Sequence, residues 1–226
     1  MYKSFFENKY YYPSLRSKLS FEIKSFLGRL FSPSIRRTNK EYLELGSGNE
    51  KKQSEIFEHL DFYNINFKKN FFSLFNSNKN KTIGHDLRYR LPYNENIFKG
   101  IFLEHTLEHL HPFDAIFLMS EIKRILKPSG IVRITVPDLD IYIDEFNKKE
   151  RSEKFSKFIN GCEIIWSLTQ NYGHLSVWNF EMLNYQLKKI GFSNIKKYSF
   201  NNGSDRNLIL DRCDRKFETL YIEAKK

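Results

Sequence analysis

Apolar and polar residues follow two periods along this chain, one typical of strands and one typical of helices. Segments with the length and composition of strands are residues 42–45, 62–67, 82–86, 98–103, 131–137, 192–200 and 217–225. Segments with helical spacing are residues 52–60, 112–126, 138–170 and 178–190. Strands that alternate with helices predict an α/β domain with a mostly parallel sheet and right-handed crossovers.

The helix predicted from residue 112 has clear signals at both ends. Pro112 suits a first helical turn, and the sequence KPSG, residues 127–130, ends the helix. The spacing places five apolar side chains on the inner side of this helix: Phe113, Ile116, Phe117, Ile122 and Ile125. The strand that follows is almost continuously apolar, as a parallel strand buried on both faces should be.

An N-terminal arm, residues 1–40, precedes the domain that we predict for residues 41–226. Apolar residues recur at helical spacing between residues 15 and 31, and Ser32-Pro33 ends this helix. The apolar set is Leu15, Leu19, Ile23, Phe26, Leu27, Leu30 and Phe31. Three interpretations stay open: the apolar stripe packs on the domain, the helix lies on an anionic membrane surface, or the arm contacts nucleic acid.

The positive charge of the chain is concentrated in this arm. The 226 residues include 37 Lys and Arg and 27 Asp and Glu, a formal net charge of +10. Residues 1–40 hold nine basic and two acidic side chains, a net charge of +7, which leaves 28 basic and 25 acidic side chains, or +3, for the rest. A nucleic-acid surface spread over the main domain is therefore not implied.

Simpler features disfavour other classes of protein. The sequence has no run of about 18 apolar residues, and its first residues lack the pattern of a secretion signal. Cys162 and Cys213 lie far apart without a Cys-x-x-Cys spacing, as is typical of reduced thiols. We therefore expect a cytoplasmic protein, peripheral at the inner membrane face if residues 15–31 bind lipid.

The sequence EYLELGSGNE, residues 41–50, joins the first predicted strand to a glycine turn. Glu44 stands just before the turn, which consists of Gly46, Ser47 and Gly48. The glycines either make a tight bend and nothing more, or form a backbone cradle for a small ligand.

The order of several motifs favours the ligand cradle. The segments YLELGSGNE, HDLRYRLPYNENIF, FLEHTLEHL, EIKRILKPSGIVRITVPDL and GHLSVWNFEMLNYQLKKIGF follow one another in this order. This set resembles the class I S-adenosylmethionine-dependent methyltransferases, and it is similar to small bacterial members often found among surface-polysaccharide biosynthesis proteins. The resemblance covers residues 41–226. It implies an α/β, Rossmann-like sheet of seven strands, mostly parallel with the last strand antiparallel, with helices on both faces.

The resemblance also implies a cofactor, S-adenosyl-L-methionine, at the carboxyl ends of the strands. The turn of Gly46, Ser47 and Gly48 would let the backbone approach the cofactor closely, because a Cβ would intrude. Glu44 would help to hold the methionine ammonium, directly or through water.

Later motifs supply the other residues that the resemblance implies. Asp86 and Leu87 match the segment at the edge of the adenine, with Asp86 as acceptor for its amino group. Glu104 and His105, at the end of the fourth predicted strand, would flank the methionyl end of the cofactor and the mouth of the substrate site.

The sequence departs from the family pattern at two positions. Asn66, at the end of the strand predicted for residues 62–67, stands where an acidic residue usually binds both ribose hydroxyls, and an amide gives up the stronger charge-assisted bonds. Lys99 stands where an aspartate commonly precedes the fourth strand. These departures motivate one alternative, a methyltransferase fold that has become an interaction module.

The histidines suggest further chemistry. The sequence HTLEH, residues 105–109, also fits a metalloprotease pattern in which His105 and His109 share a zinc ion and Glu108 is the base. This pattern directly follows a buried strand within the methyltransferase order, so we expect no metal site.

We predict His174 as a catalytic base and His105 as the second catalytic candidate. His174 follows the helical region after the fifth predicted strand, where such enzymes build their substrate lid, and it would take a proton from an acceptor hydroxyl. The alternative role for His174 is a structural histidine bonded to the backbone.

The sequence thus predicts a methyltransferase for a small-molecule acceptor, a hydroxyl or amine of a sugar or glycolipid precursor. A nucleic-acid methyltransferase that uses the basic arm is the main alternative. The sequence lacks an Asn/Asp-Pro-Pro-Tyr motif of base-methylating enzymes, so we expect nucleic acid not to be the partner.

Overall fold

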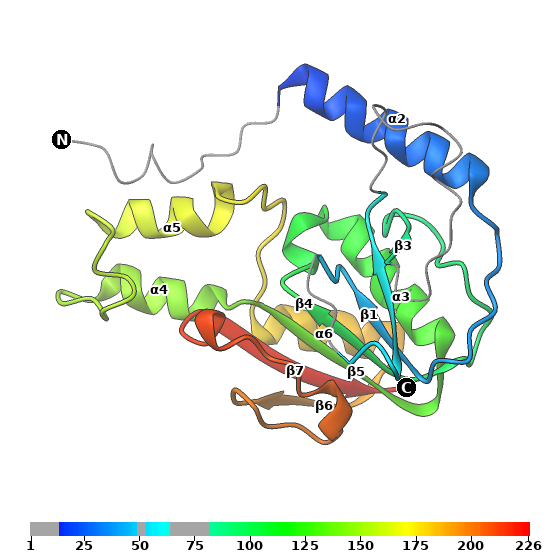
Figure 1. Ribbon diagram of the computed structural model, residues 1–226. Helices are drawn as coiled ribbons and strands as arrows, with labels where there is room; N and C mark the ends of the chain where they lie inside the picture. Colours follow the sequence, from blue (N-terminus) through cyan, green and yellow to red (C-terminus); the bar gives the residue numbers. More distant parts are fainter. Residues whose placement is uncertain (1–13, 49–52, 64–81) are drawn as a thin grey trace.

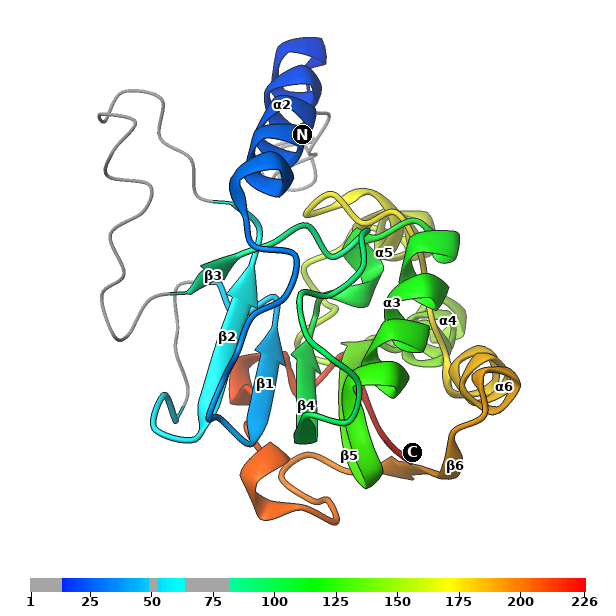
Figure 2. The same ribbon diagram turned by 90° about the vertical axis from the view of Figure 1, so that its right-hand side faces the viewer.

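A computed structural model describes residues 14–48, 53–63 and 82–226 of the chain. Seven strands form one sheet in the order β3-β2-β1-β4-β5-β7-β6 (Figures 1 and 2). The strands are β1 Tyr42–Leu45, β2 Phe57–Asp61, β3 Ile83–Gly84, β4 Phe98–Glu104, β5 Leu126–Pro137, β6 Ser193–Tyr198 and β7 Thr219–Lys225. Only β7 runs antiparallel to its neighbours, β5 and β6. The predicted seven-stranded α/β sheet is confirmed.

Five α-helices and three 3₁₀ segments accompany these strands in the described part of the chain. The helices are α2 Leu15–Phe31, α3 Pro112–Ile125, α4 Leu139–Asn147, α5 Gly161–Gln170 and α6 Phe180–Ile190. The 3₁₀ segments are η2 Leu107–His109, η3 Arg206–Leu208 and η4 Cys213–Arg215. Figure 1 shows α4 and α5 side by side at one end of the molecule and α2 along its upper edge.

The main core lies where α3 and α6 cover one face of the sheet. Leu43, Ile101 and Val132 from the strands pack there with Leu118 of α3 and Leu183 of α6, all fully buried. On the opposite face, the segment around η3 closes a smaller core of Tyr42, Phe57, Phe102 and Leu208. This arrangement leaves the carboxyl ends of the parallel strands as the edge on which a site can form.

The opposite face also contains a fully buried arginine. Arg133 of β5 donates to the carboxylates of Asp211, at 2.6 Å, and Glu223, at 2.9 Å, and to the carbonyl of Asn202. The two carboxylates compensate the cost of burying the guanidinium, and they raise its pKa above the usual value against the opposing effect of burial. The cluster joins β5, β7 and the segment between β6 and β7.

The prediction of a helix at residues 52–60 was wrong, and the strand predicted at residues 62–67 lies largely outside the described residues. Strand β2 spans Phe57–Asp61 and pairs in parallel with β1, Tyr42 facing Phe57 and Leu45 facing Leu60. Residues 56–60 are too few to distinguish a helical from a strand period, so pairing with β1 decided the structure. The strand therefore ends at Asp61, and Asn66 lies outside the described residues.

Helix α3 begins at Pro112 as predicted, but its inner face differs from the prediction. Phe113 is 87% exposed and Phe117 is 42% exposed, whereas Ala115, Leu118 and Met119 are fully buried. Ile122 and Ile125 are fully buried as predicted and Ile116 packs against the core, so only the two phenylalanines of the predicted face are exposed. The apolar residues on both sides of this helix made the sequence pattern ambiguous.

Helix α2 spans the predicted residues, and the Ser14 hydroxyl accepts from Ser17 N at its start. The interpretation that its apolar stripe packs on the domain was wrong. Small residues face the domain instead: Ser25 and Gly28 are buried, and a Cβ at Gly28 would lie 2.5 Å from the Tyr63 ring. Most of the apolar stripe is exposed, namely Leu15, Leu19, Ile23, Phe26, Leu30 and Phe31. No helix in the described ranges has both the length and the hydrophobicity needed to span a membrane.

Candidate active site

The two glycines of the turn after β1 meet different requirements. Gly46 has φ +72°, and an added Cβ would lie 2.3 Å from Thr106 Oγ1. Gly48 has φ +57°, and the described structure places no atom within 4 Å of its added Cβ. Gly46 therefore allows β1 and β4 to approach, whereas Gly48 presents bare backbone to open space. Ser47 between them is buried, and its Oγ has no hydrogen-bond partner in the described residues.

Glu44 pairs with His59 at the same edge of the sheet. His59 Nδ1 donates to Glu44 Oε2 at 2.7 Å, and both side chains are 5% exposed. His59 Nε2 is buried and has no partner within the described ranges. The helix predicted for residues 52–60 included His59, whereas the residue belongs to β2. The pair holds the Glu44 carboxylate in place, and its contact with a methionine ammonium stays a prediction.

Asp61 is a site residue that the sequence interpretation missed. It is the last residue of β2, and its Oδ1 accepts from Phe62 N at 2.6 Å. The amides of Gly46 and Ser47 donate to Leu60 O at 2.8 and 3.2 Å, which brings the glycine turn next to the end of β2. Asp61 therefore stands at the strand end that we had assigned to Asn66. The sequence FEHLD gave no clear signal, because Phe57 and Leu60 are three residues apart and fit a helix as well as a strand.

Asp86 is 2% exposed, and protein groups surround its carboxylate. It accepts from the Ser25 hydroxyl of α2, from Arg88 N at 3.0 Å and from the Arg88 guanidinium at 2.7 Å. Burial raises the pKa of Asp86, but the bonds from Arg88 and Ser25 outweigh this and hold the pKa below its usual value. Asp86 thus attaches α2 to the sheet. Its predicted contact with adenine, next to buried Leu87, stays a prediction.

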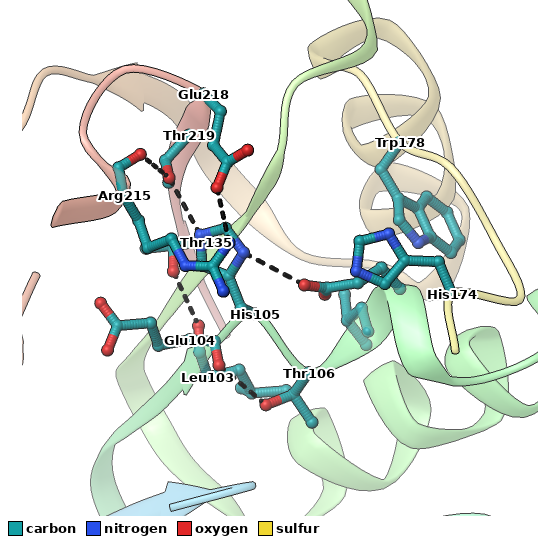
Figure 3. A network of polar contacts seen from close by, with 12 residues as sticks. Leu103, Glu104, His105, Thr106, Thr135, His174, Trp178, Arg215, Glu218 and Thr219 are labelled. Carbon is teal, nitrogen blue, oxygen red and sulfur yellow. Dashed lines mark hydrogen bonds and ion pairs between the residues drawn. The ribbon is translucent and has the colours of Figure 1, made fainter. Parts of the chain in front are cut away.

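The carboxyl end of β4 carries Glu104 and His105, as the sequence predicted. His105 has φ +46°, and its Nε2 lies 2.9 Å from Thr219 Oγ1 of β7, whose hydroxyl donates to Arg215 O (Figure 3). Glu104 Oε1 accepts from Arg212 N at 2.8 Å. The end of β4 is therefore joined to the segment that precedes β7.

The loop before α6 is attached to η2 through backbone bonds. The amides of Leu175 and Ser176 donate to Glu108 O at 2.7 and 3.2 Å. Trp178 Nε1 donates to Ser176 Oγ at 2.9 Å, and Ser176 Oγ donates to Leu107 O at 3.1 Å. The loop thereby places His174 against η2, on the side of the site opposite His105.

His174 combines features of both predicted roles. Its Nδ1 donates to Leu168 O at 2.6 Å, a bond typical of a structural histidine. Burial lowers the pKa of His174, although the charge of Glu108 and the bond to Leu168 oppose this effect. The ring also borders a pocket of about 140 Å³, which is the position required of a catalytic residue.

This pocket lies between α4, α5 and the segments on both sides of them. Its lining includes Tyr142, Lys157, Asn171, Tyr172, His174 and Arg215. Arg215 donates to Glu218 at 2.8 Å and lies over the Tyr172 ring at 5.3 Å from its centroid. Charged and aromatic groups therefore surround a space of the size of a small polar molecule.

Lys99 is remote from this edge of the sheet. It lies near the amino end of β4, and its Nζ pairs with Glu41 at 2.6 Å with both side chains about half exposed. The replacement of an aspartate by Lys99 therefore does not alter the groups at the carboxyl ends of the strands.

A family model described as a methyltransferase domain matches residues 15–197, from the start of α2 into β6. The chain belongs to this methyltransferase family. The resemblance predicted from the sequence motifs is thereby confirmed. The match includes the glycine turn, the end of β2, η2 and the loop of His174. A search among curated protein sequences found no match.

Solved methyltransferase structures are similar to this chain. The apo form of the S-adenosylmethionine-dependent methyltransferase SibL has a TM-score of 0.52 and 13% identity, over 95% of this chain and 60% of that chain. A SAM-dependent methyltransferase from Archaeoglobus fulgidus has a TM-score of 0.49 and 17% identity, over 91% of this chain and 94% of that chain. A phosphoethanolamine N-methyltransferase of Haemonchus contortus was solved in complex with phosphomonomethylethanolamine and S-adenosylhomocysteine. It has a TM-score of 0.47 and 18% identity, over 92% of this chain and 52% of that chain.

Proposed function

We propose that this methyltransferase transfers the methyl group of S-adenosylmethionine to a small-molecule acceptor. The observation that carries the proposal is the glycine turn at the end of β1, which has open backbone at Gly48 and is bonded through Gly46 N and Ser47 N to Leu60 O, the residue before Asp61 at the end of the adjacent parallel strand. Bare amides beside a carboxylate suit a nucleoside, whose ribose hydroxyls bind well to a charged acceptor. When bound, the cofactor supplies a methyl carbon activated by a sulfonium.

Other groups at this edge fit the same cofactor. Ser47 Oγ and His59 Nε2 are buried without a partner in the described residues, so a polar ligand or its water would satisfy them. Glu44, held by His59, supplies negative charge for an ammonium group. Asp61 would hold the ribose, and Glu104 with His105 would lie at the methionyl end.

The residues of this chain would act by holding two reactants in line and excluding water. Such positioning can supply on the order of 7–11 kcal/mol. The His174 ring borders the pocket that would hold the acceptor, so it is placed to receive or guide a proton from an acceptor hydroxyl.

The pocket supports a polar acceptor. Lys157, Glu163, Arg215 and Glu218 supply charges of both signs, and Tyr142 and Tyr172 supply aromatic surface. Sugars bind to such combinations of charged, hydrogen-bonding and aromatic groups. We propose a hydroxyl or amine of a sugar or glycolipid precursor as the acceptor.

Helix α2 supports contact with an anionic membrane. Leu15, Leu19, Phe26 and Leu30 recur at helical spacing and are 59–84% exposed, and the arm of residues 1–40 carries a net charge of +7. An exposed apolar helix face within a basic segment is suited to the surface of an anionic bilayer. This contact would bring the enzyme to a lipid-linked acceptor.

Calorimetric titration with S-adenosylhomocysteine tests the cofactor site. We expect binding to the unaltered chain, and on the order of tenfold weaker binding for Asp61→Asn, because a charge-assisted bond is lost. Gly48→Val should abolish binding, since its side chain would enter the cradle. Lys99→Ala, at the other end of the sheet, is the matched control and should bind normally. No binding by the unaltered chain at millimolar ligand would refute the proposal.

A further inference from the structure

A buried carboxylate and two histidines converge where η2 meets the loop before α6. The potential ligand atoms of Glu108, His109 and His174 all lie within 4.8 Å of one another. The rings of His109 and His174 meet edge to face with centroids 5.1 Å apart. His174 is 66 residues after Glu108 and 65 after His109 in the sequence, so only the fold brings it to them.

Glu108 is a buried carboxylate with one ion-pair partner, His105, in the described part of the chain. It is 1% exposed, and neither of its oxygens has a hydrogen-bond partner in the part of the chain that the structure describes. Its Oε1 forms an ion pair with His105 Nδ1 at 3.2 Å, a contact that leaves Oε2 without a partner in the described residues. Burying an ionised carboxylate in this way is costly unless a cation compensates it. We infer that Glu108, His109 and His174 form a binding site for a divalent transition-metal cation.

The surroundings orient His174 for this role. Its Nδ1 donates to Leu168 O, so Nε2 keeps its lone pair for a cation. Metal-binding histidines usually make such a bond with the other ring nitrogen. The amides of Leu175 and Ser176 donate to Glu108 O and so fix the loop to η2. The backbone therefore helps to set the distances between the potential metal-ligand atoms.

The donor set selects the kind of cation. Two imidazoles with one carboxylate suit zinc and other first-row divalent metals, whereas magnesium and calcium prefer oxygen ligands. Three protein ligands leave at least one position open, as in catalytic zinc sites. The site differs from the metalloprotease pattern of the sequence, because η2 is a 3₁₀ segment and His174, not His105, supplies the second imidazole.

The site shares His174 with the pocket of about 140 Å³. Asn171 lines the same pocket, and its buried Oδ1 has no partner among the described side chains and backbone groups. A cation on His174 Nε2 would therefore be close to the acceptor, and it would replace that ring nitrogen as the group that assists loss of the acceptor proton. The open position of the cation would bind the acceptor oxygen or nitrogen, and only these statements about the acceptor rest on the proposed methyl transfer.

Zinc titration of the chelator-treated full-length chain tests the site. The exposed Cys162 and Cys213 can also bind zinc, so all variants carry Cys162→Ser and Cys213→Ser. We expect one equivalent of zinc, measured by competition with a chromophoric chelator, and a cobalt spectrum typical of nitrogen and oxygen ligands. His109→Ala and His174→Ala should each weaken zinc binding by 100-fold or more. Loss of a group that only hydrogen-bonds to a metal ligand already costs about 10–100-fold in metal affinity.

His111→Ala is the matched control, since this exposed histidine is two residues from His109 and outside the cluster. It should bind zinc as the parent does. His109 is itself exposed, so His109→Ala should fold even if Glu108→Gln does not. The inference fails if the parent binds no zinc or cobalt, or if His109→Ala and His174→Ala both bind as tightly as His111→Ala. S-adenosylhomocysteine titration of the same samples separates this failure from failure of the cofactor site.

Discussion

Thr106 lies against Gly46 so closely that residue 46 has no room for a side chain. The Thr106 hydroxyl, 2.3 Å from the position of an added Cβ, donates to Leu45 O at 3.2 Å and so joins the carboxyl ends of β1 and β4. One contact therefore fixes the position of the glycine turn and the direction in which the chain leaves β4.

Gly46→Ala should destabilise the protein by about 2–3 kcal/mol. A left-handed backbone costs a non-glycine residue about 1–2 kcal/mol, and the clash with Thr106 adds to this. Adding Thr106→Ala to the same chain should relieve the clash but not the backbone strain. The effects of the two substitutions on the free energy of unfolding should therefore not be additive. Urea unfolding of the four chains measures this coupling. Additive effects would show that Thr106 does not restrict residue 46.

The buried cluster of Arg133 offers a second test of stability. Asp211→Ala should cost about 3–5 kcal/mol, because it leaves a buried guanidinium with an incomplete set of partners. Asp214→Ala is the matched control: this aspartate is exposed, pairs with Arg212 and should change stability by less than about 1 kcal/mol. Equal unfolding midpoints for the two variants would contradict the assignment.

The contact of Asp86 with α2 should depend on pH. The folded protein holds the pKa of Asp86 below its usual 3.8, so the stabilisation is present above pH 3.8 and is lost as the pH falls through the lower folded value. Asp86→Asn should therefore lower the free energy of unfolding by about 2 kcal/mol at pH 7. This difference should shrink below pH 3.8. A difference that is constant from pH 7 to pH 3 would show that the charge of Asp86 is not the cause.

Vesicle sedimentation tests the membrane contact of α2. The chain should bind vesicles that contain phosphatidylserine and not vesicles of phosphatidylcholine alone. Leu19→Ser with Phe26→Ser should reduce binding by on the order of 100-fold or more, since each apolar side chain contributes about 1.5–3 kcal/mol when buried. Phe113→Ser, an exposed aromatic on α3, is the control and should bind normally. If the chain instead sediments as a dimer, and the α2 substitutions dissociate this dimer, then α2 binds a protein and not a membrane.

The sequence predicted most strands because their apolar runs were long or clearly bounded. The apolar runs at β4 and β5 fitted strands and not helices, and the glycine turn identified the end of β1. The segment at β2 failed because five residues fit a helix and a strand equally well. That error put the predicted strand end near Asn66, whereas β2 ends at Asp61, an acidic residue of the type that the resemblance implies at this strand end.

The orientation of elements and long-range contacts could not be predicted in this way. Periodicity showed that α2 has an apolar face, but not that Ser25 and Gly28 on another face would contact the domain. Likewise, nothing in the local sequence places His174 beside Glu108, because the backbone bonds from Leu175 and Ser176 that join them form only in the folded chain.

The bond from Ser25 to Asp86 has a thermodynamic consequence for the whole enzyme. The segment of Asp86 and Leu87 is the one expected beside the adenine, and the same carboxylate retains α2. Linkage between two events that share one group is reciprocal. Lipid adsorption that pulls α2 from the sheet would change nucleoside affinity, and a nucleoside that recruits Asp86 would release the helix toward the bilayer by the same factor.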